Sequence, residues 1–422
     1  MEDEKKIFEE IAHKLNLSEF KKNNNRNYFN ADKIILHKKF GILIFLIIVI
    51  ITLSIGIHLG QILSNFISFT ISKLFTAINL YIYNNDIKYF LNSFVYITLE
   101  SILTCAIQIF SIYTSIYILK ECGYLSRGIF LIDKIMKFIG LNGNSFIPII
   151  NNFGCNVPGI LSTRIIQEKN VRFITILISP LISCPAKLPI YFLITGIYFS
   201  FIKQIFIILF IYLFGIIMAI ITSKLASILL KKIKKNEINI INSFTEIPSY
   251  EFPNIFSVIK ISFKKSTEFI KHTAHIIIIF TFILWILNNF PKNVKTEDKY
   301  ISKICKHIDP VLKHLGFSPK MNIALVGGVF AKETIPAILK TLYNYEESNK
   351  NTEIKNEIPL KVGISFLIFC SLYCPCINTI IAIKNELNLF YSILFTSYYT
   401  FLSFFFFIYF VSCFIIKIFL YL

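Results

Sequence analysis

The sequence predicts an all-α polytopic membrane protein, and three observations support this fold class. Hydrophobic residues make up 55 % of the 422 positions, and the mean hydropathy is +0.64. Charged residues make up only 16 %, whereas an ordinary soluble domain has about 25 %. A soluble fold of this length has no interior large enough for so much apolar surface, so the long apolar runs belong in lipid.

The net charge of +18 does not indicate a nucleic-acid-binding protein. Nucleic-acid recognition needs a basic face on a soluble domain, whereas these lysines lie between apolar stretches, where contact with membrane lipid explains them. Nine cysteines, an odd number that lies mostly inside apolar runs, argue against a disulfide framework.

The first elements are a polar stretch and a membrane span. Residues 1–39 carry many charges and are expected to form a cytoplasmic spacer without a signal peptide. Residues 40–97 are expected to hold the first span, with its core at Gly41–Gly60, and an external segment. The further candidate spans are 101–119, 173–198, 204–230, 274–290, 361–383 and 391–416. Together with two interrupted segments, 146–163 and 322–341, they predict about 7–9 membrane crossings.

Basic residues favour a cytoplasmic N-terminus, with 120–172 and 231–272 on the same side. The lysine-rich loop 291–321 then lies outside, against the rule. Residues 231–273 are expected to form a cytoplasmic loop, in which 254–272 is an amphipathic helix on the membrane surface. Its apolar face consists of Ile255, Ile259, Phe263 and Ile270, and its basic face of Lys260, Lys264 and Lys271.

An internal repeat divides the rest of the chain. Residues 139–163 are similar to 315–341, so that Pro158 corresponds to Pro336. Further on, Leu-Ile-Ser-Cys-Pro ending at Pro185 corresponds to Leu-Tyr-Cys-Pro ending at Pro375. These matches predict two gate repeats, 98–230 and 274–422, in an inverted arrangement with broken or re-entrant helices. Broken apolar segments in corresponding halves are typical of a transporter's substrate site, although chance similarity between isoleucine-rich segments is the alternative.

Glycine and proline mark the predicted helix breaks. Proline removes a backbone donor, and an unpaired carbonyl in lipid is costly unless it lines a cavity or an ion path. The predicted break positions are Gly154, Pro158, Pro189, Pro336 and Pro375.

Four side chains at these segments are candidate metal ligands. Cys155 and Glu333 come from the interrupted segments, and Cys184 and Cys376 come from the Cys-Pro spans. Thiolate and carboxylate together suit a borderline divalent transition metal better than an alkali cation or a sugar. The alternative for each cysteine is a small apolar residue, which is how Cys370 is interpreted.

Five further polar residues are candidates for a transport path. Charged residues inside a membrane are functional candidates by default, although Lys187 could equally neutralise a carboxylate or extend to the interface. The candidates are Gln108, Glu121, Asn156, Lys187 and Lys332.

Motifs of soluble enzymes are missing from the sequence. It contains no GxxxxGK[ST], HExxH or GxSxG, so neither catalysis nor a nucleotide site is expected in this chain.

Several stretches resemble one family in its own order. They are Glu121–Arg127, Gly154–Pro158, Ser183–Pro189, Glu246–Tyr250, Leu284-Trp285, Ala331–Glu333 and Pro375-Cys376. From about residue 30 onward the chain is similar to the membrane part of the bacterial ferrous iron transport protein B (FeoB) family. Gln108 also falls where that family has a membrane glutamine. Asn152, Cys122, Pro185, Lys187 and Asn378 depart from the family's usual residues.

The resemblance implies a multi-pass ferrous-iron permease of the bacterial inner membrane, built from two gate modules. It implies Fe²⁺ as the transported substrate, with Cys155, Cys184 and Cys376 as gate cysteines and Glu333 as part of the Lys-Glu pair. The family's N-terminal GTP-binding domain is not found in this sequence. Either a separate GTP-binding chain supplies this domain, or the gene is reduced, or the protein works without the domain. A small SH3-like Feo partner and a homo-oligomer are the other partners that the resemblance implies. The alternative is a gate-fold protein of another class, either a nucleoside-type carrier or a non-conducting assembly subunit.

Overall fold

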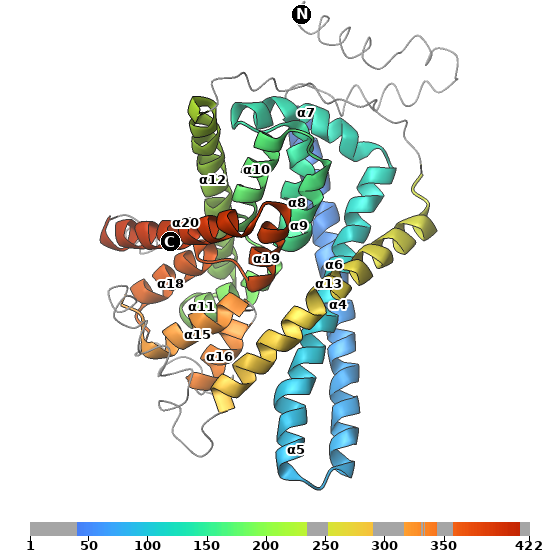
Figure 1. Ribbon diagram of the computed structural model, residues 1–422, viewed down its shortest axis with the longest axis vertical. Helices are drawn as coiled ribbons and strands as arrows, with labels where there is room; N and C mark the ends of the chain where they lie inside the picture. Colours follow the sequence, from blue (N-terminus) through green and yellow to red (C-terminus); the bar gives the residue numbers. More distant parts are fainter. Residues whose placement is uncertain are drawn as a thin grey trace, which may run out of the picture.

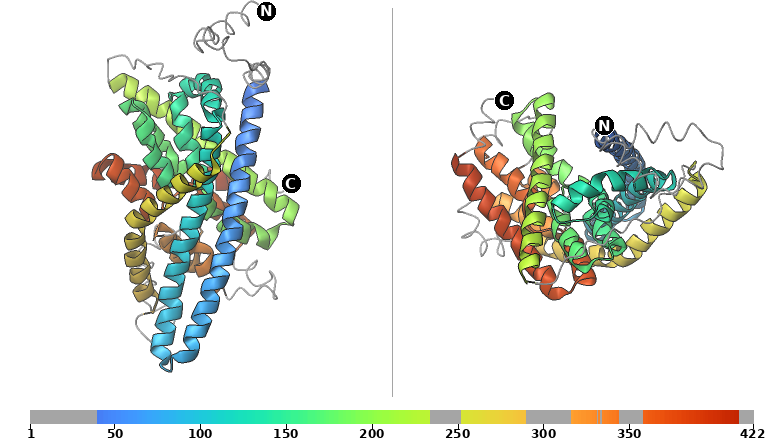
Figure 2. Two further views of the ribbon diagram at one scale, coloured as in Figure 1. Left: turned by 90° about the vertical axis from the view of Figure 1, so that its right-hand side faces the viewer. Right: turned by 90° about the horizontal axis from the view of Figure 1, so that it is seen from above.

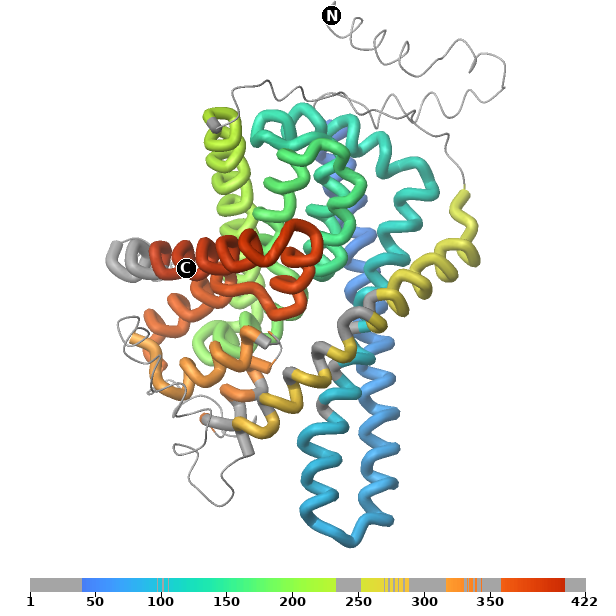
Figure 3. The backbone as a smooth tube through the Cα atoms, viewed as in Figure 1, coloured from blue at the N-terminus to red at the C-terminus, as the bar shows by residue number. Residues whose placement is uncertain are grey.

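The computed structural model describes residues 40–233, 252–289, 316–330, 332, 334–343 and 358–413 (Figure 3). Across these ranges every regular element is a helix, which confirms the all-α prediction. The predictions for the spacer 1–39, for Glu333 and for residues 234–251 of the loop 231–273 lie outside the described residues.

The helices follow one another with short connections (Figure 1). The first group is α4 (Phe40–Tyr81), α5 (Asn85–Phe90), the π-helix η1 (Leu91–Tyr96), α6 (Ile97–Glu121) and α7 (Tyr124–Phe138). The second group is η2 (Gly143–Ser145), α8 (Phe146–Gly154), α9 (Asn156–Ser162), η3 (Thr163–Ile165), α10 (Lys169–Ile178), η4 (Ser179–Leu181), η5 (Pro185–Lys187), α11 (Leu188–Tyr198) and α12 (Phe201–Ile233). The third group is α13 (Ile255–Asn289), α15 (Pro319–Phe330), α16 (Thr334–Leu342), α18 (Leu360–Leu372), α19 (Ile377–Glu386) and α20 (Leu389–Cys413).

Helix α4 is much longer than the predicted first span. It runs for 42 residues because no glycine or proline follows Gly60 before its end at Tyr81. Residues 61–97, expected as an external segment, are therefore mostly helical. Figures 1 and 2 show α4 and α6 running together beyond the rest of the molecule to the turn at α5.

Small residues bring α4 and α6 close together. A methyl group on Gly56 would lie 2.2 Å from Ser115 Oγ, and one on Gly60 would lie 3.2 Å from the Ser111 Cβ atom. Ser111 Oγ donates a hydrogen bond to the Gly56 carbonyl at 2.6 Å. This is the small-xxx-small packing of membrane helices, and it fixes α4 against the first helix of repeat 1.

Helix α13 replaces two predicted elements. The amphipathic segment 254–272 and the span 274–290 were expected to be separate, but residues 255–289 form one helix because no glycine or proline interrupts them. Figure 1 shows α13 crossing α6, and Ser266 Oγ donates to the Ala106 carbonyl at 2.8 Å at this crossing.

Six helical segments of the described chain are long and apolar enough to cross a membrane. They are Phe40–Tyr81, Asn85–Glu121, Lys169–Tyr198, Phe201–Lys232, Leu360–Glu386 and Leu389–Phe406. Two of the six, Lys169–Tyr198 and Leu360–Glu386, contain a break, and these two are also the most buried. The chain is therefore a multi-pass membrane protein.

The order of helices supports the predicted repeat. In each half a long helix (α6 or α13) is followed by a broken pair (α8–α9 or α15–α16). A second broken pair (α10–α11 or α18–α19) and a long helix (α12 or α20) complete each half. One apolar core joins the halves, and in it the buried Tyr399 of α20 donates to the Leu177 carbonyl of α10 at 2.7 Å.

Candidate functional site

The three predicted cysteine ligands all lie at helix breaks. Cys155 is the single residue between α8 and α9. Cys184 lies in the irregular stretch between α10 and α11, and Cys376 lies in the corresponding stretch between α18 and α19. Each of the three cysteines therefore lies between two helical stretches, while Glu333 lies outside the described residues.

The first break exposes Cys155 to a very small cavity. Cys155 is extended, with φ −161° and ψ 135°. Pro158 has no N–H and cannot donate to the Gly154 carbonyl four residues earlier. A cavity of about 10 Å³, roughly the space of one water molecule, lies beside Cys155. Its other lining residues are Ile109, Ile112, Tyr113, Asn151 and Pro158.

Cys184 and Cys376 form a pair that joins the two repeats. Both residues are extended, with φ −89° and ψ 161° at Cys184 and φ −64° and ψ 154° at Cys376. Their thiols lie close enough to interact electrostatically. The Cys376 Sγ atom is also 3.1 Å from Thr379 Oγ1. The structure thus places Cys184 and Cys376 within electrostatic range of each other, and Cys155 within the same range of Tyr113 on α6.

Two buried lysines, Lys187 and Lys332, hold the second break in place. Lys187 Nζ donates to the Ser371 carbonyl at 2.7 Å, in the last turn of α18. Lys332 Nζ donates to the Cys374 carbonyl at 2.6 Å and lies 3.3 Å from the centre of the Tyr373 ring. The last carbonyls of a helix have no partner within it, so an ammonium group satisfies them and complements the helix dipole.

Both lysines also lie within electrostatic range of Cys184 and Cys376. Cys370 lies in the same range and is fully buried in the apolar core of α18. Sequence reasoning did not place Cys370 near the site, because only the fold brings α18 beside the two lysines.

A complete metal centre is not assembled by protein side chains in the described part of the chain. No three His, Cys, Asp or Glu residues there form a group that could hold a metal ion. The Cys184–Cys376 pair offers two sulfur atoms, so this arrangement suits passing contact better than tight retention of a cation.

The other predicted path residues occupy separate places. Glu121 accepts hydrogen bonds from the Asn254 N–H at 3.1 Å and from Ser257 Oγ at 3.0 Å, and so caps the start of α13. Gln108 lies on α6 at the contact with Gly60 of α4. Asn156 begins α9, and its buried Oδ1 accepts no hydrogen bond.

The predicted prolines mostly mark the start of a helix. Pro158, Pro189 and Pro336 lie in the first turns of α9, α11 and α16, where the missing N–H costs little. Only Pro375 lies inside a break, between α18 and α19. Extended residues lie at three of the breaks, with Cys155 before α9, Cys184 before η5 and Cys376 before α19.

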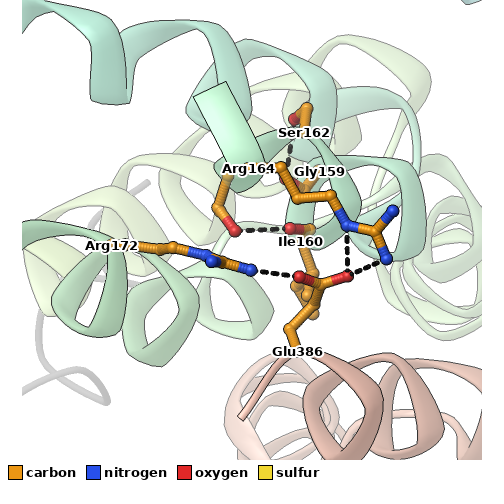
Figure 4. A network of polar contacts seen from close by, with 7 residues as sticks. Gly159, Ile160, Ser162, Arg164, Arg172 and Glu386 are labelled. Atoms are coloured by element: carbon orange, nitrogen blue, oxygen red, sulfur yellow. Dashed lines mark hydrogen bonds and ion pairs between the residues drawn. The ribbon is translucent and has the colours of Figure 1, made fainter. Parts of the chain in front are cut away.

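An ion-pair network between the repeats was not expected from the sequence. Figure 4 shows the Glu386 carboxylate between two arginines of repeat 1. Arg164 Nη2 lies 2.7 Å from Glu386 Oε1, and Arg172 Nη2 contacts Glu386 Oε2. The carboxylate raises the pKa of Arg164 above its usual value through a hydrogen bond and charge attraction. In the sequence, only the unusual position of Glu386, at the end of the second Cys-Pro span, could have suggested this ion-pair network.

The chain belongs to the Gate family, described as "Nucleoside recognition", whose profile matches residues 102–198 and 271–390. These two segments fall in the two predicted gate repeats. The match therefore agrees with the repeated helix order.

Among known proteins, the chain is similar to several ferrous-iron transporters. It is 32 % identical over 377 residues to "Fe(2+) transporter FeoB" of Staphylococcus aureus (strain COL), covering 86 % of this chain and 55 % of that protein. It is 28 % identical over 413 residues to the protein of the same name from Leptospira interrogans (strain Fiocruz L1-130), covering 90 % and 59 %. The resemblance to the FeoB membrane domain is thereby confirmed.

A third relative has a composite name. The chain is 27 % identical over 408 residues to the "Fe(2+) transport protein A/Fe(2+) transporter FeoB fusion protein" of Porphyromonas gingivalis (strain ATCC BAA-308 / W83), covering 84 % and 48 %. The chain thus spans about half the length of the curated relatives it matches. No solved structure matches it.

Proposed function

We propose that this chain is the membrane permease for ferrous iron in a bacterial inner membrane, with Fe²⁺ passing between the two gate repeats. The observation that carries the proposal is the pairing of Cys184 from repeat 1 with Cys376 from repeat 2, at two helix breaks. The printed names of the relatives support ferrous iron as the substrate.

Sulfur ligands match the chemistry of this substrate. Fe²⁺ is a borderline cation that accepts thiolate ligands, whereas Mg²⁺ and Ca²⁺ prefer oxygen. Broken helices leave carbonyl oxygens in the same region, and non-helical backbone at membrane depth is tolerated where it is buried or lines a path. Two sulfurs and nearby carbonyls would therefore bind Fe²⁺ for a short time during passage.

The two lysines would make that binding weak enough for release. In their protonated form, Lys187 and Lys332 would place positive charge near Cys184 and Cys376, and this charge would repel a divalent cation. Conduction requires that an ion bind well enough to enter but weakly enough to leave. We assign the lysines this role in addition to holding the second break.

Cys155 and Glu333 would form a second binding position for Fe²⁺ on the path. Cys155 lies at the corresponding break of repeat 1, beside a cavity of the size of one ion or water molecule. The internal repeat supports this proposal, because Glu333 falls near the position in the sequence that corresponds to Cys155.

Partners would complete the system. The fusion name of the Porphyromonas relative supports a small Feo partner for this chain. We also propose that a separate chain supplies a GTP-binding domain and that several copies of this chain assemble. The N-terminus is proposed to lie in the cytoplasm. Lysine counts support that orientation.

Uptake of radioactive Fe²⁺ into proteoliposomes under anaerobic conditions tests the proposal. The account predicts uptake by the unaltered chain and loss of most of it in Cys184→Ser and Cys376→Ser. Cys122→Ser is the matched control, because Cys122 caps α6 away from the pair. Equal uptake by all of these variants would contradict the assignment of the path.

The family description supports a second candidate, a nucleoside-type carrier. Uptake of radioactive nucleosides is measured in the same proteoliposomes. Nucleoside uptake without Fe²⁺ uptake would favour this carrier, and uptake of neither would favour a non-conducting assembly subunit.

A further inference from the structure

A cavity of about 530 Å³ lies between the two repeats, and neither Cys184 nor Cys376 lines it. Repeat 1 contributes residues of α6, α8, α9 and η3, and repeat 2 contributes residues of α13 and α19. Figure 1 shows these helices around one region, with α13 crossing α6 and α19 beside α9. The volume is in the range of small-molecule sites, about 300–1,000 Å³.

The walls of this cavity are mainly apolar, with Asn151, Asn378 and Asn385 among them, and its rim is basic. Apolar side chains reach it from both repeats, among them Ile116, Val157, Leu161 and Ile381. Three exposed cations also line it: Lys120 on α6, Arg164 on η3 and Lys265 on α13.

Positive charge remains at the rim after the known ion pairs are taken into account. Lys265 pairs with Glu268 at 3.0 Å, and Glu386 serves both Arg164 and Arg172. The Lys120 ammonium lies 5.6 Å from the centre of the Tyr117 ring, and no ion pair of Lys120 occurs among the described residues. Cations therefore outnumber carboxylates around this opening.

We propose that the cavity binds an anionic phospholipid, with an acyl chain against the apolar walls and the phosphate at Lys120 and Lys265. A basic pocket between membrane helices is suited to an anionic headgroup. A hydrated cation would meet net positive charge there, and a wholly polar solute would meet apolar walls. The phospholipid is the ligand class that satisfies both parts of the cavity.

The position of the cavity gives the lipid a structural consequence. Because both repeats line it, a bound lipid bridges them and its affinity depends on their relative placement. The cavity also shares Tyr113 and Asn151 with the small cavity beside Cys155. Lipid binding is thus expected to affect the packing around that break, whether or not the chain carries iron.

Fluorescence quenching in nanodiscs tests the proposal with the full chain. The single tryptophan, Trp285, is replaced in Trp285→Phe, and Tyr117→Trp then places the only indole at the cavity. Quenching by brominated phosphatidylglycerol is compared with quenching by brominated phosphatidylcholine at equal mole fractions. Each lysine near an anionic headgroup is expected to contribute about fivefold to the preference for phosphatidylglycerol.

The variants separate a specific site from general surface charge. Lys120→Gln with Lys265→Gln is expected to abolish the preference, whereas Lys134→Gln with Lys224→Gln, on α7 and α12 outside the cavity, is expected to keep it. Equal quenching by both lipids, or an unchanged preference in the Lys120 and Lys265 variant, would overturn the proposal. Displacement of the lipid by glycerol phosphate at the same concentration would instead show a site for soluble phosphate. Displacement of the lipid by Mn²⁺ would show a cation site. Either result would also overturn the proposal.

Discussion

Two kinds of membrane helix occur side by side in this protein. In the broken segments Lys169–Tyr198 and Leu360–Glu386, 67 % and 72 % of the most apolar stretch of each segment is buried inside the protein. In the four unbroken segments the share lies between 22 % and 44 %. Backbone groups without helical partners are tolerated at membrane depth only where protein covers them, so the breaks lie in the buried helices.

The comparison also explains where the chemistry lies. Most side chains of α4 are exposed at the surface of the molecule, and the exposed ones are apolar along most of its length. The broken segments carry the half-buried Cys184 and Cys376 and the buried Lys187 of the candidate site. Burial permits the break, and the break presents thiols and carbonyls toward the interface between the repeats.

The largest expected effect on the free energy of unfolding comes from making the same substitution in each of the two kinds of helix. Ile176 in α10 is fully buried, whereas Ile50 in α4 is 61 % exposed. Ile176→Ala should lower the free energy of unfolding by about 2–5 kcal/mol, because it leaves a cavity in a packed region. Ile50→Ala should change it by less than about 0.5 kcal/mol. Thermal unfolding in detergent measures both, and equal losses would contradict the contrast in burial.

The ion-pair network between the repeats should give the next largest effect. The Glu386 side chain is 2 % exposed, so Glu386→Gln leaves two arginines without their anion. Breaking a buried pair costs about 3–5 kcal/mol, and we expect about 2 kcal/mol here because Arg164 is 67 % exposed and screened by solvent. Glu268→Gln, which removes the anion of the exposed pair with Lys265, is the matched control. An equally small loss in both variants would show that the network does not hold the repeats together.

Two glycine substitutions test the packing of α4 against a site with free space. Gly56→Ala would place a methyl group 2.2 Å from Ser115 Oγ and should destabilise the protein by about 1 kcal/mol. Gly196→Ala in α11 meets only Gln204 Nε2 at 3.6 Å and should stabilise it by about 0.5 kcal/mol. Differential scanning of the two purified variants gives the sign of each change. The same sign for both would be inconsistent with the close contact of α4 and α6.

The smallest expected effect concerns the start of α13. Glu121 accepts two hydrogen bonds at this helix N-terminus. Glu121→Gln keeps an acceptor but removes the negative charge, so a loss of about 0.5 kcal/mol is expected. Hydrogen exchange of the first turn of α13 should rise with it, and exchange confined to other helices would contradict this role.

Much of this architecture was predictable from local patterns. The matched prolines and glycines of the two repeats indicated where the helices are interrupted. Proline lacks an N–H and glycine lacks a side chain, so each affects the backbone close to its own position. Helix lengths were predicted less well: hydropathy identified Gly41–Gly60 but not the continuation of α4 to Tyr81. The length of a helix is set by where its backbone is interrupted. The length of its apolar stretch is set by the thickness of the lipid, and the two lengths can differ.

Contacts between the halves could not be predicted. Arg164 and Glu386 are 222 residues apart, and Lys187 binds the carbonyl of Ser371, 184 residues away. Neither separation leaves a periodic signal in the sequence. Lys187 and Lys332 were selected as unusual membrane charges, but their function as caps of the second break needed the fold.

The central claim is that two buried breaks, one from each repeat, bring Cys184 and Cys376 to a single metal-binding position. Titration of the reduced, purified chain with Cd²⁺, a soft divalent probe, measures this directly through the thiolate-to-cadmium absorbance. The account predicts one Cd²⁺ whose signal is lost in both Cys184→Ser and Cys376→Ser but kept in Cys122→Ser. A signal that survives in either of the first two variants would contradict it.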